Sequence, residues 1–143
     1  MKARRRARGV ALQTLFEVDL AGHDASRVLE QRLADCDVTA DGLEFARHLV
    51  EGVLKNLSEI DPTIRKIAPE WPLEQMSPID KNILRIAIFE MTFDPEIPVK
   101  VAINEAVELA KLFGSESSRR FVNGALGTLA SQQISTQTHC EGP

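Results

Sequence analysis

Three histidines are the first candidates for chemistry in this chain, and none has a partner at a useful spacing. His23 follows a glycine that ends a predicted helix, His48 falls on a helical flank, and His139 lies near the C-terminus. Isolated histidines of this kind are usually ordinary surface or boundary residues. The motifs GxGxxG, GxxxxGK[ST], HExxH and GxSxG are all absent. The sequence therefore predicts no catalytic residue, no metal site and no cofactor, and we do not expect an enzyme.

A cluster of cations at the N-terminus is the stronger signal. Its members are Lys2, Arg4, Arg5, Arg6 and Arg8. They belong to a chain with 17 basic and 21 acidic residues, and every acidic residue lies at Glu17 or beyond. Cations at a helix N-terminus oppose the helix dipole, whereas guanidinium groups bind phosphates and stack on bases. This asymmetry favours an anionic partner such as RNA over a merely solvated N-terminus.

Other charged and aromatic residues have less distinctive contexts. Arg119 and Arg120 precede Phe121, and a second nucleic-acid patch is about as consistent with this pattern as a polar face beside a core phenylalanine. Glu105 and Glu108 are interpreted as solvated, with Glu108 three residues before Lys111.

The elements that must position these residues are helical, because apolar residues recur at three- and four-residue spacing and no alternating strand pattern appears. Residues 77–91 form the central element. Ser77 and Pro78 are helix-start signals, and the following residues are apolar on nearly every side, as in a helix buried among others. Arg85 and Glu90 interrupt this run, and we expect Arg85 to pair with Glu105.

The other predicted elements surround this central helix. The first is a helix over residues 4–20, which Gly22 ends. It is followed by helices over residues 26–36, 39–57 and 61–67, by a turn at 73–76, and by helices over 100–113 and 118–129. Trp71 is expected to pack into the core from the connector. Gly124 and Gly127 disfavour a helix, which suggests the close approach of another backbone.

Length and composition predict one all-α domain over residues 1–130, with halves of about 1–69 and 73–130. Residues 131–143 are polar and are expected to form a disordered tail. Cys36 and Cys140 suggest no disulfide framework, and no secretory signal is evident, so a cytoplasmic protein without membrane contact is expected.

Four blocks of sequence resemble the NusB transcription antitermination family. They are RRRARGVALQTLFEVDL at 4–20, ILRIAIFEM at 83–91, VKVAINEAVELAKLFG at 99–114 and RRFVNGALG at 119–127. The resemblance covers roughly residues 3–130 and implies two small three-helix subdomains packed into one compact helical domain. It also implies a non-enzymatic role: binding boxA-type single-stranded RNA of nascent rRNA leaders with the ribosomal protein NusE, in an antitermination complex with RNA polymerase.

The resemblance also implies functional positions. On the RNA side these are Arg4, Arg5, Arg6, Arg8, Phe16, Ser117, Arg120, Phe121 and Asn123. On the NusE side they are Asp80 and Lys81. Three positions depart from the family pattern: Phe16 stands where tyrosine is frequent, and Ser117 and Gly127 stand where acidic residues are frequent. The loss of an acidic group at Ser117 is not expected to weaken binding to phosphate.

Two other functions fit a helical domain of this kind. One is a purely protein-binding scaffold with an incidental basic N-terminus. The other is a stand-alone relative of the N-terminal RNA-binding domain of rRNA cytosine methyltransferases, although the chain contains no glycine-rich cofactor loop. The sequence leaves open whether the protein is a monomer or a homodimer.

Overall fold

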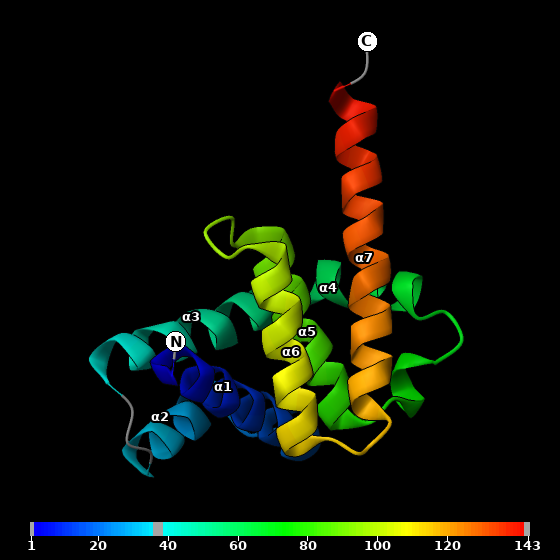
Figure 1. Cartoon of the computed structure of the whole chain (residues 1–143). Helices are drawn as coiled ribbons and strands as arrows, with labels where there is room; N and C mark the ends of the chain where they lie inside the picture. The colour runs from blue at the N-terminus through cyan, green and yellow to red at the C-terminus, as the bar shows by residue number, and fades with distance from the viewer. Residues whose placement is uncertain (1, 36–38, 142–143) are drawn as a thin grey trace.

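Helix α5 (Pro78–Phe93) runs through the middle of the molecule (Figure 1). The structure is a computed structural model and describes residues 2–35 and 39–141. Its start is capped as expected, because the Ser77 side chain accepts a hydrogen bond from the Asp80 backbone N–H at 3.4 Å. All residues from Asn82 to Glu90 are buried, and α5 packs against α1, α3, α4, α6 and α7. The prediction of a central core helix is confirmed.

All regular elements in the described part of the chain are helical. They are α1 (Lys2–Ala21), α2 (Ala25–Asp35), α3 (Ala40–Lys55), α4 (Leu57–Ile67), the short 3₁₀ helix η1 (Leu73–Gln75), α5, α6 (Val99–Phe113) and α7 (Ser118–Glu141). Helix α1 packs on α2 and α3, while α6 packs on α7. In Figure 1, α1, α2 and α3 lie to the left of α5, α6 lies in front of it, and α7 lies to its right. The predicted all-α class is confirmed.

Two boundaries differ from the expected ones. Helix α4 begins at Leu57 rather than at residue 61 and contains Pro62 in its interior, because Asn56 ends α3 and starts α4 without a loop. Helix α7 continues to Glu141, and its last part stands away from the body (Figure 1). The sequence predicts a disordered tail from residue 131. That expectation and the division into two halves remain proposals.

Arg85 is held by different partners from the expected one. Its Nε and Nη2 donate to the two carboxylate oxygens of Asp61 on α4, both at 2.9 Å, and its Nη1 lies 3.6 Å from Asp19 on α1. Asp19 also binds Lys81 at 2.8 Å. The predicted Arg85–Glu105 pair is therefore wrong, since α4 and the end of α1 supply the carboxylates. This network joins α1, α4 and α5.

The glycines of α7 do not serve close packing. A Cβ atom at Gly124 or Gly127 would meet nothing within 4 Å, so the expected approach of another backbone is wrong. Gly52 on α3 is a position where a missing side chain matters for helix packing, because a Cβ there would lie 2.2 Å from the Phe89 ring. Phe89 is buried on α5, so Gly52 lets α3 and α5 approach each other.

Two glycine-to-alanine substitutions should therefore have opposite effects on the free energy of unfolding. Gly127→Ala should stabilise the protein by up to about 1 kcal/mol, because alanine is the better helix former and meets no neighbour. Gly52→Ala should destabilise it by about 1–3 kcal/mol, because the ring must shift. Urea denaturation of both variants measures the difference. A stabilised Gly52→Ala variant would contradict the packing of α3 on α5.

Candidate nucleic-acid interface

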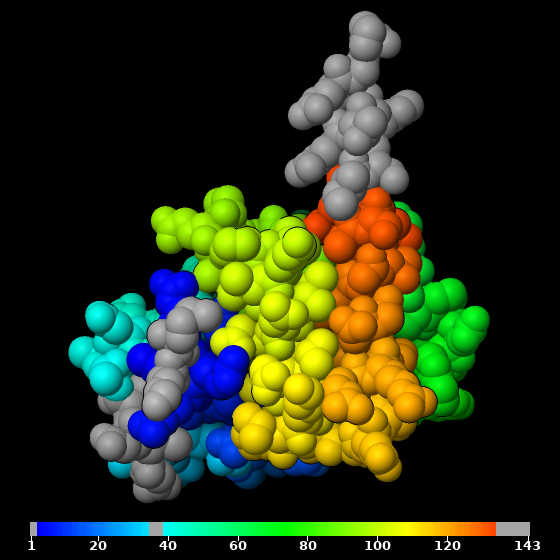
Figure 2. Space-filling view, in the orientation of Figure 1, coloured from blue at the N-terminus to red at the C-terminus, as the bar shows by residue number. Residues whose placement is uncertain are grey.

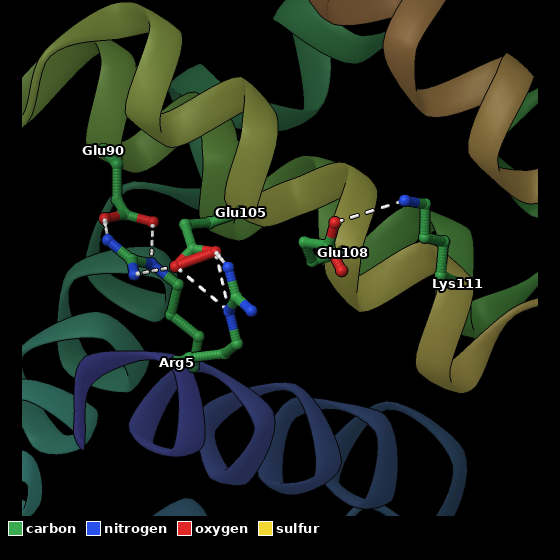
Figure 3. A network of polar contacts seen from close by, with 6 residues as sticks. Arg5, Glu90, Glu105, Glu108 and Lys111 are labelled. Carbon is green, nitrogen blue, oxygen red and sulfur yellow. Dashed lines mark hydrogen bonds and ion pairs between the residues drawn. The ribbon is translucent and has the colours of Figure 1, made fainter. Parts of the chain in front are cut away.

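Arg8 lies at the centre of a buried charge cluster that joins three helices. Figure 3 shows its two carboxylates, Glu90 and Glu105, with Arg5 beside them. Its Nε and Nη2 donate to the two carboxylate oxygens of Glu90 on α5, at 3.0 and 2.7 Å. Its Nη1 donates to Glu105 on α6 at 3.4 Å. The side chains of Arg8, Glu90 and Glu105 are only 2, 1 and 3% exposed. The expectation that Glu105 is solvated is wrong, whereas the pair of Glu108 with Lys111 is confirmed at 3.2 Å.

Arg5 completes the cluster at the surface. Its Nε donates to Glu105 at 3.1 Å, and its Nη2 lies 3.0 Å from the same carboxylate. The side chain is nevertheless 51% exposed. The hydrogen bond and the negative charge of Glu105 raise the pKa of Arg5 above its ordinary value. Arg5 is therefore a firmly charged group with one edge toward the protein and the remainder toward solvent.

Arg4 and Arg6 are exposed on either side of Arg5. The Arg4 guanidinium lies 4.6 Å from the centre of the Phe45 ring on α3, a distance suited to a cation–π contact. The sequence places no acidic residue beside these arginines along the chain, but the fold brings Glu90 and Glu105 to Arg8 and Glu105 to Arg5. Arg4, Arg5 and Arg6 present charge on the surface, while Arg8 anchors the helix that carries them.

The remaining residues assigned to the RNA side by resemblance come from two elements, α1 and the start of α7. Phe16 is half-buried on α1, whereas Ser117 and Asn123 are exposed near the start of α7. Helices α1 and α6 pack against each other, and a Cβ at Gly9 would lie 3.7 Å from Phe113 at the end of α6. The contact with α6 thus connects α1 to the loop that leads into α7.

Arg120 and Phe121 face away from that contact, toward the connector between α4 and η1. The rings of Phe121 and Trp71 meet edge to face, with centres 6.2 Å apart. Trp71 is 55% exposed, so the expectation that it packs into the core is wrong. Together with Gly124 and neighbouring residues, these side chains line a pocket of about 270 Å³. Asn123 is not among the lining residues.

The two residues assigned to the protein partner differ in availability. Lys81 is largely buried and paired with Asp19. Asp80 is half-buried, and its Oδ1 atom has no hydrogen-bond partner in the structure. Lys81 is already neutralised by Asp19, whereas the Asp80 carboxylate forms no ion pair among the described residues. Asp80 is therefore the better candidate for a contact with another protein.

Nothing in the described part of the chain suggests a metal site, since no group of three His, Cys, Asp or Glu residues converges there. His48 Nε2 lies 3.2 Å from an Asp94 carboxylate oxygen, as an exposed pair. The side chains of Cys36, His139 and Cys140 lie outside the described residues. Within the described residues, no helix combines the length and apolar character needed to cross a membrane.

The anchoring role of Arg8 predicts a large loss of stability when its side chain is removed. Arg8→Ala should destabilise the protein by about 3–5 kcal/mol, because it leaves the buried carboxylates of Glu90 and Glu105 without their shared guanidinium. Arg4→Ala is the matched control and should cost under about 1 kcal/mol, because its charge is exposed. Urea denaturation at neutral pH measures both values. Equal losses would mean that the cluster does not anchor α1.

Comparisons with known proteins agree with this architecture. The NusB family model matches residues 5–131. The transcription antitermination protein NusB of Dehalococcoides mccartyi strain CBDB1 is 48% identical over 139 residues, which cover 97% of each chain. The solved NusB of T. maritima superposes with a TM-score of 0.83, at 37% identity and 90% coverage of each chain.

A further solved structure contains a partner and RNA. It is described as antitermination factors NusB and NusE in complex with double-stranded RNA. The matching chain has a TM-score of 0.84 and 25% identity, over 92% of the present chain and 98% of that one. The family match over most of the chain, together with a relative 48% identical over nearly its whole length, leads to one conclusion. The chain belongs to the NusB family.

Proposed function

We propose that this protein is an RNA-binding transcription antitermination factor that binds boxA-type single-stranded RNA of nascent rRNA leaders together with NusE. The observation that carries the proposal is the display of Arg4, Arg5 and Arg6 on the exposed face of α1, in a chain that is acidic overall. The related NusB solved with NusE and RNA supports the same assignment. The proposed role is one of binding rather than catalysis, in the cytoplasm where nascent rRNA and RNA polymerase are found.

The proposed RNA surface begins at the three exposed arginines and continues along α1. Arg8 is not kept as a contact residue, because its guanidinium is buried between two carboxylates. Phe16 is half-buried, and its accessible edge would contribute stacking. Ser117 and Asn123 extend the surface at the start of α7, where both are exposed. Basic side chains supply salt-sensitive affinity, while aromatic stacking adds affinity that salt screens little.

The salt dependence of RNA binding tests the arginine surface. Each phosphate neutralised on a single strand contributes about −0.7 to the slope of log affinity against log salt. Replacing Arg4, Arg5 and Arg6 by glutamine should therefore flatten this slope by about 2 and weaken binding most at low salt. Fluorescence anisotropy with a labelled boxA-type oligonucleotide, measured over a series of salt concentrations, gives the slope.

A control variant removes the same number of charges elsewhere. Lys55, Arg65 and Lys66 are exposed near the ends of α3 and α4. Their replacement by glutamine changes net charge equally, so it should leave most of the slope intact. If both triple variants lose the same slope, binding reports net charge alone, and the protein-binding scaffold becomes the better interpretation.

The proposed NusE contact at Asp80 has its own test. Asp80→Lys should weaken NusE binding at least tenfold, because it replaces the unpartnered acceptor by a cation, and it should leave RNA binding by α1 largely unchanged. Glu59→Lys is the control, since Glu59 is exposed in the first turn of α4 and its loss has a similar effect on a helix dipole. Calorimetric titration with purified NusE measures both. Unchanged NusE binding by a folded Asp80→Lys variant would remove Asp80 from the interface.

A further inference from the structure

The pocket between the connector and α7 has features that the core does not explain. Trp71 leaves more than half of its surface in solvent, although tryptophan is usually highly buried. Its ring meets the Phe121 ring edge to face, at 73°, so the two rings are not stacked in parallel. Trp71 thus offers accessible aromatic surface beside a hollow of about 270 Å³.

A cation lies at the same pocket. Arg120 lines it and is exposed, and no hydrogen bond or ion pair holds its guanidinium within the described structure. Glu70 also lines the pocket but forms no ion pair with Arg120 among the described residues. Arg120 therefore remains available to a ligand, and its guanidinium matches the geometry of a phosphate group.

The floor of the pocket is left open by a glycine. Gly124 lies on α7 one turn after Arg120, and a Cβ there would meet nothing within 4 Å. A glycine inside a helix costs about 1 kcal/mol relative to alanine, and at this position no packing contact requires it. The result is extra room in the pocket, whose volume falls near the lower limit for small-ligand sites, about 300 Å³.

We propose that Trp71 and Arg120 form a subsite for one unpaired nucleotide of the bound RNA, with the base stacked on the indole and its phosphate on the guanidinium. An aromatic face beside a free arginine is the combination used to bind single-stranded nucleic acid. The small volume suits one flat ring better than a helix or strand of a protein partner. This inference rests on the proposed RNA-binding function. The family resemblance already implies Arg120 and Phe121, and what the structure adds is Trp71 and the pocket beside it.

The connector that carries Trp71 and the N-terminal segment that carries the arginines lie on opposite sides of the view in Figure 2, with α6 and α7 between them. In Figure 2 the N-terminal segment is at the left, α6 is in the middle, and the start of α7 and the connector follow to the right. One RNA strand would have to pass α6 and the start of α7 to occupy both places. A short oligonucleotide should therefore occupy only the arginine surface, and a longer one should also reach Trp71.

Intrinsic fluorescence reports on this subsite directly, because Trp71 is the only tryptophan in the chain. Titration with boxA-type single-stranded oligonucleotides of increasing length should quench the emission once the strand reaches the pocket. Short oligonucleotides should bind without quenching. Trp71→Ala should weaken binding of the long RNA about 5- to 150-fold, as expected for one stacked base, and should leave binding of the short RNA unchanged.

Neighbouring arginines supply the matched control. Arg119 and Arg120 are both exposed on α7, but only Arg120 lines the pocket. Arg120→Gln should reduce both the quenching and the affinity for long RNA more than Arg119→Gln does, although the two variants have the same net charge. Gly124→Leu should fill the pocket and abolish quenching, while circular dichroism should show that α7 is retained.

The outcomes separate this inference from the proposed function. Long RNA that binds with the arginine-dependent salt slope but leaves Trp71 emission unchanged would overturn the subsite and preserve the proposed function. Absence of any RNA binding would overturn both. A change in Trp71 emission caused by NusE alone, with none caused by RNA, would assign the pocket to a protein partner and also overturn the subsite.

Discussion

The guanidinium of Arg8, buried between Glu90 and Glu105, is the interaction on which the arrangement of α1, α5 and α6 depends. One cation cannot balance two buried carboxylates, and the second positive charge comes from Arg5 at the surface. Burial of unbalanced charge is costly, so the two arginines and two glutamates are stable only when all three helices are in register. The cluster therefore defines the position of α1 more specifically than apolar packing alone would.

This constraint also determines how the N-terminal charge is presented. Because Arg8 holds α1 against the body, the exposed arginines one turn earlier project from a fixed helix, which reduces the entropy lost on binding. Arg5 both neutralises Glu105 and offers its guanidinium to RNA, so a bound phosphate would share that guanidinium with the Glu105 carboxylate. Phosphate binding by Arg5 is therefore coupled to the charge balance of the buried cluster.

The sequence was sufficient to predict the class of fold, the central helix and most helix boundaries, because the apolar spacing around Leu84 and Ile88 is unambiguous and both residues are fully buried. Charge asymmetry indicated the basic N-terminus, and the family resemblance added Phe16 and the positions at the start of α7. The burial of Arg8 could also have been predicted from the sequence, since this residue lies one turn before Leu12 on the apolar stripe of α1. The pairing of Arg8 with Glu90 and Glu105 could not have been predicted in this way, because those residues are brought together only by the packing of three helices. The exposed face of Trp71 likewise depends on how the connector meets α7, which no local pattern encodes.

In the proposed RNA complex, electrostatic attraction acts mainly at the N-terminal segment and base stacking at the connector, which lie on opposite sides of the view in Figure 2. Most of the protein is acidic and repels RNA, so attraction is concentrated at the few arginines of α1 and at the start of α7. Such attraction acts at a distance and weakens with salt, whereas a base stacked on Trp71 contributes only at contact and is screened little. Charge at the N-terminal segment would therefore favour encounter with many RNAs, and the pocket at the connector would retain those that place an unpaired base at the required distance. Selectivity in this arrangement arises from the spacing between two weakly specific sites.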